Sequence, residues 1–337
     1  MNLLVTGGAG FIGSNFIHYI LDKYSDYKIV NLDALTYAGN LENLKSVANN
    51  SNYKFIKGDI GDYNLVDKIV KENNTDIIIN FAAESHNSWA VVNPTIFFKT
   101  NVLGTQNLLE VARKNGGIRF HHISTCEVYG DLALDSDEKF TENSPFLPRT
   151  PYNASKAGSD LAVRAYFETF KLPVTISNCS NNYGPYQFPE KLIPLFTTNL
   201  IEDKKVPVYK NSQNRREWLH VLDHCSAIDL IIHQGKIGET YNVGSGIEQS
   251  IEQITDFIFK ELGQTDLMKE YVQDRPGHDR RYLLDSTKIR HKLGWKPQID
   301  FGEGLKQTVQ WYKDNRAWWK PLKEKNVLAE ADWVNKK

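Results

Sequence analysis

The sequence predicts an α/β fold in which a parallel sheet carries helices on both faces. Two observations support this prediction. Short apolar runs alternate with amphipathic stretches through the first half of the 337 residues. A glycine-rich segment, residues 6–13, directly follows the first of those runs. Strands separated by helices of this length form β-α-β units, in which the strands run parallel.

The apolar runs predict six strands, at residues 3–5, 28–32, 53–57, 77–81, 119–124 and 173–177. Amphipathic stretches predict helices at 14–24, 63–72, 101–115 and 152–170. Beyond about residue 180, strands shorten and Pro and Gly become frequent, with further helices at 251–262 and 301–315. We therefore expect a Rossmann-type dinucleotide-binding domain over residues 1–180. A smaller α/β substrate-binding region spans 181–337, with some segments returning to the sheet, and its aromatic tail is expected to dock.

Composition excludes several classes of function. The formal net charge is −1, without the basic excess of a nucleic-acid-binding protein. The sequence has no apolar run of the roughly 18 residues that a membrane span needs, and the chain starts with a strand pattern instead of a signal peptide. Cys126, Cys179 and Cys225 are scattered, which indicates neither disulfides nor a metal site. We expect a cytoplasmic enzyme without a metal.

The glycine segment predicts a dinucleotide site. Gly7 permits a sharp turn from strand to helix, Gly10 lets the backbone approach a pyrophosphate, and Gly13 allows close helix packing. The N-terminus of the following helix offers free N–H groups to phosphates. Asp33 ends the second strand, 20 residues after Gly13. Its carboxylate suits the ribose hydroxyls and repels a 2′-phosphate, so NAD is favoured over NADP.

A second motif predicts chemistry beside the nicotinamide. Tyr152 and Lys156 are four residues apart on one helix, and so share a face. An ammonium near a phenol favours the phenolate and lowers its pKa, so that the tyrosine can accept a proton from a sugar hydroxyl. Ser124 and Thr125 end a predicted strand, and either hydroxyl can hydrogen-bond the same substrate oxygen. Open α/β sheets place their sites at such strand ends.

Together these motifs resemble the extended short-chain dehydrogenase/reductase superfamily, and within it the nucleotide-sugar 4,6-dehydratases. The resemblance runs from residue 1 to about residue 315 and rests on six further strings: LTYAGN at 35–40, AAESH at 82–86, FHHIST at 120–125, NCSNNYGPY at 178–186, FPEKLIP at 188–194 and RPGHDRRY at 275–282. These strings are far more specific than the glycine turn.

The resemblance implies a three-step reaction on bound NAD. Tyr152 would deprotonate the C4 hydroxyl while hydride leaves C4, and Glu127 would then remove the C5 proton as the C6 hydroxyl leaves as water. Hydride would return to C6 and give a 4-keto-6-deoxy sugar. A product in which hydride returns to C4, leaving a 5,6-ene, remains an alternative.

The resemblance also implies the site residues. The catalytic set is Thr125, Cys126, Glu127, Tyr152 and Lys156. The expected NAD-binding residues are Gly7, Gly10, Phe11, Ile12, Gly13, Asp33, Ala34, Thr36, Asp59, Ile60, Ala82, Ala83, Ser85, Thr100, Tyr152 and Lys156. The expected substrate-binding residues are His86, Trp89, Asn181, Glu190, Lys191, Leu192, Arg216, Asn242, Arg275 and His278. Pairing through the helices at 95–115 and 152–170 would give a homodimer with a four-helix bundle.

The chain departs from the family pattern at two places. The family's Thr-Asp-Glu becomes Thr125-Cys126-Glu127. A thiol keeps its proton at neutral pH but is a much weaker acid than a carboxyl group. Cys126 is therefore either the acid for the leaving hydroxyl, or a spectator beside a Glu127 that shuttles the proton itself.

The second departure follows His86, where Val-Asp-Arg-Ser becomes Asn87-Ser88-Trp89-Ala90. We expect this segment to line the hexose pocket. Loss of two charges and gain of an indole favour an acetamido sugar, so UDP-N-acetylglucosamine is the first expected substrate and dTDP-glucose the next. A nucleotide-sugar 4-epimerase, a decarboxylase and a catalytically silent NAD- or nucleotide-sugar-binding protein are the alternatives.

Overall fold

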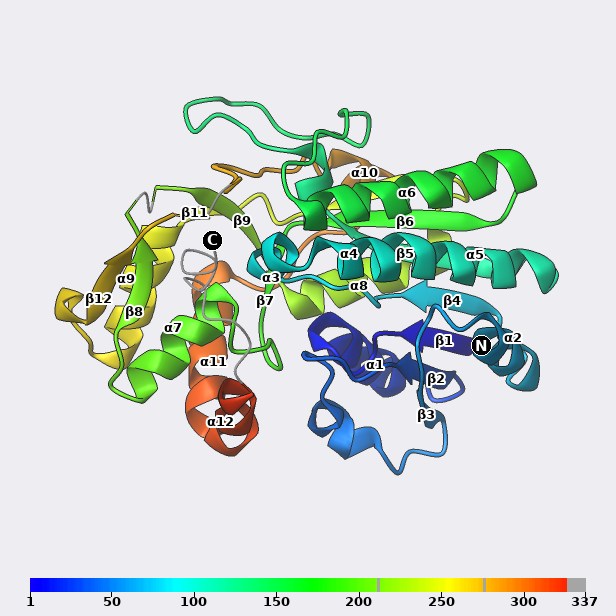
Figure 1. Ribbon diagram of the computed structural model, residues 1–337, viewed down its shortest axis with the longest axis horizontal. Helices are drawn as coiled ribbons and strands as arrows, with labels where there is room; N and C mark the ends of the chain where they lie inside the picture. The colour runs from blue at the N-terminus through cyan, green and yellow to red at the C-terminus, as the bar shows by residue number, and fades with distance from the viewer. Residues whose placement is uncertain (211–212, 275–276, 326–337) are drawn as a thin grey trace.

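The computed structural model describes residues 1–210, 213–274 and 277–325. It confirms a doubly wound parallel sheet of seven strands in the order β10-β6-β5-β4-β1-β2-β3 (Figure 1). The strands are β1 Asn2–Thr6, β2 Lys28–Asp33, β3 Tyr53–Lys57, β4 Ile77–Asn80, β5 Arg119–Thr125, β6 Val174–Cys179 and β10 Thr240–Val243. All six expected strands are present. The seventh, β10, comes from beyond residue 180 and pairs with β6.

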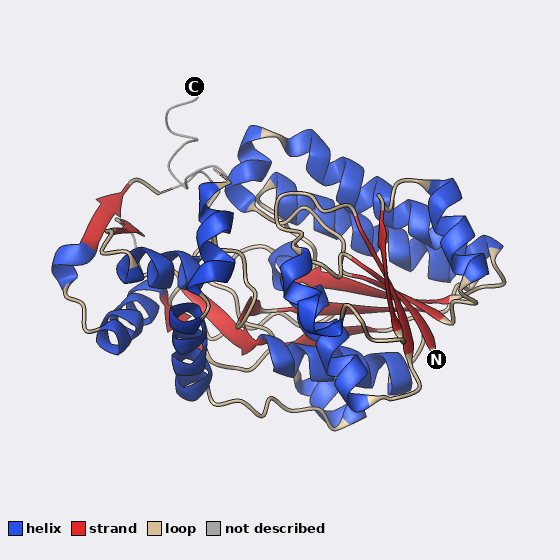
Figure 2. Cartoon of the chain, turned by 90° about the horizontal axis from the view of Figure 1, so that it is seen from below, coloured by secondary structure: helices blue, strands red, loops and turns tan. Residues whose placement is uncertain are grey.

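Two helix layers cover the sheet, as Figure 2 shows edge-on. Helices α1, Phe11–Lys23, and α8, Val221–Gln234, contribute to the apolar core on one face. Helices α2, Tyr63–Glu72, α5, Thr105–Lys114, and α6, Pro151–Phe170, pack on the other. Strands buried on both faces read as continuous apolar runs, and the three central residues Leu3, Leu4 and Val5 of β1 are all fully buried.

Short helical segments connect β4 to α5. They are α3, Asn87–Val92, α4, Pro94–Phe97, and a π-helical segment, Phe98–Gly104, that continues directly into α5. The helix expected at 101–115 therefore begins earlier than its sequence pattern indicates. Strand β5 ends in a 3₁₀ helix, Cys126–Tyr129, and a second 3₁₀ helix, Leu41–Val47, follows β2.

The smaller region lies beside the carboxyl ends of the sheet strands, on the left in Figure 1. Its strands are β7 Asn181–Tyr183, β9 Arg215–His220 and β11 Glu248–Ser250 in one sheet, and β8 Val206–Tyr209 with β12 Lys269–Val272 in another. Its helices are α7 Leu192–Ile201, α9 Ile251–Leu262, α11 Phe301–Asp314 and α12 Arg316–Glu324, with a 3₁₀ turn at Asp266–Met268. Helix α10, Thr287–Leu293, instead packs beside β10 of the main sheet. Its own apolar core includes Tyr183, Phe196, Trp218 and Leu305.

The aromatic tail docks as expected. Trp319 on α12 is fully buried, and its indole N–H donates to the carbonyl of Tyr312 at 2.7 Å. Trp318 donates to Asn43 Oδ1 at 2.9 Å, and so ties α12 to the 3₁₀ helix that follows β2. Within the described residues, no helix is both long and apolar enough to cross a bilayer.

Replacing the buried indole should destabilise the fold. Trp319→Ala leaves a cavity and loses the apolar burial of a large ring, so the free energy of unfolding should fall by about 3–5 kcal/mol. Denaturant unfolding measures this change. Lys320→Ala, an exposed neighbour on the same helix, is the control and should stay near wild type. Equal stability of the two variants would contradict the docking.

Candidate functional site

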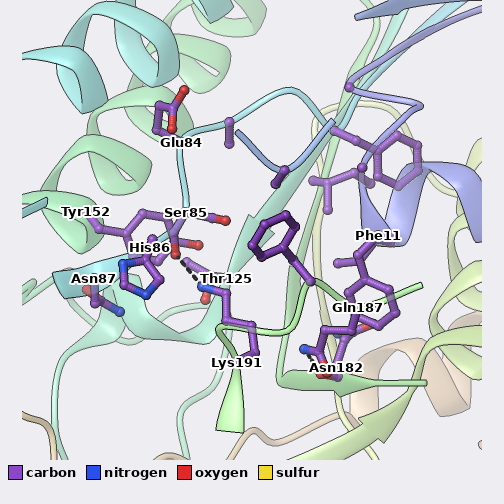
Figure 3. Close-up of a pocket in the computed structure, with 18 of the residues that line it drawn as sticks. Phe11, Glu84, Ser85, His86, Asn87, Thr125, Tyr152, Asn182, Gln187 and Lys191 are labelled. Carbon is purple, nitrogen blue, oxygen red and sulfur yellow. Dashed lines mark hydrogen bonds between the residues drawn. The ribbon is translucent and has the colours of Figure 1, made fainter. Parts of the chain in front are cut away.

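A cavity of about 430 Å³ runs along the carboxyl ends of the strands and into the smaller region (Figure 3). Every residue expected to bind NAD lines it, from the glycine turn to Lys156. Of the expected catalytic residues, Thr125, Glu127, Tyr152 and Lys156 line it and Cys126 does not. The sequence therefore places both motifs in one cavity.

The glycine turn leaves no room for side chains. Gly7 has φ +69°, and a Cβ there would approach the backbone of Ala82 to 2.6 Å. A Cβ at Gly13 would lie 2.5 Å from the carbonyl oxygen of Gly7. No side chain caps the start of helix α1 after Gly10, which leaves the first backbone N–H groups of the helix without a side-chain acceptor. Such a terminus fits a pyrophosphate.

Asp33 stands at the end of β2, beside this turn. Its Oδ2 accepts the N–H of Ala9 at 2.9 Å and its Oδ1 accepts that of Leu35 at 2.8 Å. Burial raises the pKa of Asp33, and the two N–H donors oppose that rise. The carboxylate is thereby held rigidly at the edge of the cavity, where a ribose diol fits.

Tyr152 and Lys156 project from α6, but the predicted lowering of the tyrosine pKa is not seen. Burial, followed by the charge of Glu127, raises the pKa of Tyr152, while a hydrogen bond with Thr125 lowers it. Lys156 Nζ instead donates to the carbonyl oxygen of Ile123 at 2.7 Å. Burial lowers the pKa of Lys156 to about 8.

Strand β5 contributes polar side chains that lie next to Tyr152 and Lys156. Ser124 Oγ donates to Asp160 Oδ2 at 2.8 Å, so its proton is engaged and Thr125 provides the hydroxyl beside Tyr152. His122 lies 3.3 Å from Lys156 Nζ and contributes to the same buried polar network. Burial raises the pKa of Asp160 to about 6, and the nearby Lys156 charge opposes that rise.

Glu127 reaches the cavity because the chain leaves the strand after Thr125 and enters a 3₁₀ helix. Glu127 Oε2 accepts the side-chain N–H of Asn87 at 3.0 Å, and Asn87 Oδ1 accepts the hydroxyl of Thr150 at 2.8 Å. Asn87, His86 and Tyr152 all line the cavity and are labelled in Figure 3.

The position of Cys126 favours the spectator alternative over the acid alternative, because its side chain does not line the cavity. Its side chain is 1% exposed and packs in an apolar cluster with Val128, Tyr129 and Ala157. The turn that brings Glu127 to the cavity directs its neighbour away from it. Burial raises the pKa of the thiol, so it stays neutral, and it lies apart from the substrate space.

The substrate end of the cavity contains most of the expected residues: His86, Asn181, Glu190, Lys191, Leu192, Arg216 and His278. Lys191 Nζ donates to the carbonyl of Ser85 at 3.0 Å, and Tyr37 donates to Glu190 Oε1 at 3.0 Å. The guanidinium of Arg216 lies 4.6 Å from the ring centre of Tyr282. Its N–H groups bind the carbonyl oxygens of Arg215, Asp279 and Arg280.

Two expected substrate residues lie elsewhere. Trp89 on α3 does not line the cavity, because the short helix directs His86 and Asn87 inward instead. Asn242 on β10 is fully buried between Tyr129, whose hydroxyl it accepts at 2.9 Å, and the carbonyl of Phe140. It therefore stabilises the sheet edge. Arg275 lies outside the described residues.

Sequence reasoning missed an apolar end of the cavity, formed by Phe196, Pro207, Tyr209, Trp218 and Ile251. In sequence these side chains are indistinguishable from core residues, and two of them, Phe196 and Trp218, also belong to the core of the smaller region. Trp218 Nε1 is buried and has no hydrogen-bond partner in the described part of the chain. In the same part, no group of three or more His, Cys, Asp or Glu is arranged to hold a metal ion.

Comparisons with known proteins agree on the kind of site. The profile of the GDP-mannose 4,6 dehydratase family matches residues 4–308. A dTDP-glucose 4,6-dehydratase of Streptomyces niveus is 49% identical over 96% of each chain. The crystal structure of dTDP-glucose 4,6-dehydratase from Bacillus anthracis in complex with NAD is 50% identical, with TM-score 0.90, over 96% of this chain and 99% of that one. A UDP-glucose 4-epimerase of Thermotoga maritima, solved with UDP-glucose, is 29% identical with TM-score 0.86, over 94% and 100%.

Buried histidines near the site should make the fold sensitive to acid. Burial lowers the pKa of His121 and of His224 to about 3 in each case. In the unfolded chain a histidine titrates near pH ~6.5, so the unfolded state binds more protons below that pH. The free energy of unfolding should therefore fall as the pH drops from about 6.5 toward 3.

Urea unfolding at a series of pH values measures this dependence. His224→Gln should reduce its slope, because one titrating group is removed. His291→Gln, at an exposed position, should leave the slope unchanged. An unchanged slope in His224→Gln would refute the neutral buried form.

Proposed function

The chain belongs to the GDP-mannose 4,6 dehydratase family, and we propose that within it the protein is an NAD-dependent dTDP-glucose 4,6-dehydratase. The observation that carries this proposal is the set of groups that one cavity brings together. The glycine turn and Asp33, the pair Tyr152 and Glu127, and Arg216 all line it. Relatives at 46–49% identity bear the name of this activity, and two structural neighbours with that name were solved with NAD.

This proposal reverses the order of substrates that the sequence favours. The preference for UDP-N-acetylglucosamine depended on the loss of two charges after His86 and on the gain of Trp89 in the hexose pocket, and Trp89 lies outside the cavity. The most similar relatives named above offer no support for that sugar. The apolar cavity end with Phe196, Pro207 and Ile251 suits the methyl group of thymine.

The chain's own groups provide the acid–base chemistry. Bound NAD supplies a hydride acceptor at the start of the cycle and a hydride donor at its end. Tyr152, hydrogen-bonded with Thr125, accepts the proton of the C4 hydroxyl as that carbon is oxidised. The resulting 4-keto group acidifies the C5 hydrogen, which Glu127 removes.

Glu127 also serves the leaving group. The carboxylate takes the C5 proton and delivers it to the C6 hydroxyl, which leaves as water, so Glu127 returns to its ionised form. The proton taken from the C4 hydroxyl balances the one added at C5 when the product forms. The net change is the loss of one water, and it needs no proton from Cys126, whose thiol packs in an apolar cluster.

Three broader expectations accompany this function as proposals. Residues 1–180 bind NAD, and residues 181–337 mainly bind the nucleotide sugar. Two copies pair through the helices at 95–115 and 152–170, because large apolar side chains are exposed on both: Phe98 and Leu103 on the first, Leu161 and Phe170 on the second. The enzyme works in the cytoplasm, where buried free thiols such as Cys225 stay reduced.

Mass spectrometry of the purified protein incubated separately with dTDP-glucose, UDP-N-acetylglucosamine and UDP-glucose tests the proposal. Loss of one water from dTDP-glucose is the expected result. Water lost from UDP-N-acetylglucosamine alone would restore the earlier order of substrates. Interconversion of sugars without loss of water would indicate a 4-epimerase.

Removing the charge of Glu127 should block elimination without blocking oxidation. In Glu127→Gln the amide cannot accept the C5 proton, so turnover should fall at least about 100-fold. C4 oxidation continues, so reduced cofactor should accumulate and be visible by absorbance. Glu138→Gln, at an exposed position, is the control. Normal turnover of Glu127→Gln would assign the C5 base to another group.

Replacing Cys126 should have little effect. Cys126→Ala removes a neutral thiol from an apolar cluster and no group from the cavity, so dehydration should stay within a few-fold of wild type. Steady-state kinetics with dTDP-glucose measure this. A fall of about 100-fold, the loss expected for a general acid, would place the thiol among the reacting groups.

A further inference from the structure

We propose that Asn87 is a positioning residue that orients Glu127 for proton removal at C5. This inference rests on the function proposed above. Asn87 is the first residue of α3 and lines the cavity. Its side-chain amide lies between two partners, donating from Nδ2 to Glu127 Oε2 at 3.0 Å and accepting the Thr150 hydroxyl at 2.8 Å.

The surrounding hydrogen bonds determine which end of the amide faces Glu127. Thr150 caps α6, and its hydroxyl oxygen accepts the N–H of Asn153 at 3.2 Å. Since that oxygen is an acceptor there, its own proton is available for Asn87 Oδ1. The amide oxygen is thus directed to Thr150 and the amide N–H to Glu127.

This arrangement constrains the carboxylate without neutralising it. The amide binds Oε2, and no hydrogen bond from the described residues reaches Oε1, which is left for the substrate hydrogen. Thr150 precedes Tyr152 by two residues, so the hydrogen bond from Thr150 to Asn87 ties Glu127 to the start of the helix that carries Tyr152.

The position of this amide matches the chain's two departures from the family pattern. Asn87 stands where that pattern has Val, which has no donor for a carboxylate. The family pattern has an Asp directly before Glu127, and this chain has Cys126 there. Glu127 therefore both removes and delivers the proton. A carboxylate with two tasks depends more strongly on its orientation, because misplacement by about 1 Å costs on the order of 100-fold in rate.

Single-turnover kinetics with dTDP-glucose separate the steps, since reduced cofactor appears at C4 oxidation and disappears after elimination. Asn87→Val removes the donor, and the isosteric Asn87→Asp places a second carboxylate against Glu127. In both variants the disappearance should slow on the order of 100-fold. The rate at which reduced cofactor appears should stay within a few-fold of the wild-type rate. Deuterium at C5 should slow the disappearance more strongly than in wild type.

Two controls separate positioning from folding. Ser88→Ala changes the adjacent residue, whose buried hydroxyl has no hydrogen-bond partner among the described residues, and should leave both phases unchanged. Thr150→Val breaks the chain of hydrogen bonds and should reproduce the selective slowing. Thr150→Ser restores the hydroxyl and should recover the wild-type rate.

An unchanged disappearance phase, or equal slowing of both phases, would overturn the proposal. A wild-type protein that releases no water would instead overturn the proposed function. Crystal structures of the wild type and Asn87→Val decide the role of Asn87 even then. We expect the Glu127 carboxylate to leave its position in the variant, and an unmoved carboxylate would overturn the proposal.

Discussion

The contact between helix α6 and strand β5 is the constraint on which the rest of the site depends. Lys156, Ser159 and Asp160 of α6 are buried against His122, Ile123 and Ser124 of β5. Burying an ammonium and a carboxylate is unfavourable unless each is paired or hydrogen-bonded. Here Lys156 donates to the carbonyl oxygen of Ile123, and Ser124 donates to Asp160 Oδ2. Asp160 Oδ1 has no hydrogen-bond partner among the described residues and lies 3.5 Å from His122 Nε2. The helix register that brings Tyr152 to the cavity follows from this buried network.

The same burial sets the acid–base properties of the site. Desolvation moves the pKa of Lys156 down to about 8 and that of Asp160 up to about 6, and each charge opposes the shift of the other. The pKa of each group therefore lies closer to 7 than the ordinary pKa of that group does. The pKa of Tyr152 is raised, so its ionisation depends on the hydrogen-bond donors that face it, above all Thr125. Holding these reactive groups away from water therefore lowers the stability of the fold.

Much of the fold could be predicted from the sequence, because strands buried on both faces read as unbroken apolar runs. The strand Tyr53–Lys57 and the helix Tyr63–Glu72 have the predicted bounds. Strand β10 was not predicted individually, since its four residues are too short for a pattern to emerge. The glycine turn was predictable because few other motifs need three glycines at that spacing. The apolar cavity end was not, because Phe196 and Trp218 look like core residues until the chain is folded.

The positions of Cys126 and Trp89 outside the cavity share one physical cause, which is a short helix that follows a strand of the sheet. A strand extended through residues 125–127 would alternate its side chains, but the 3₁₀ helix starting at Cys126 buries the thiol while keeping Glu127 on the cavity. A similar short helix after His86 turns Asn87 inward and leaves Trp89 outside. The two helices meet at the hydrogen bond from Asn87 to Glu127. Side chains that depart from the family pattern at separate points of the sequence are therefore neighbours in space, and the loss of an acid at one is accompanied by a new donor at the other.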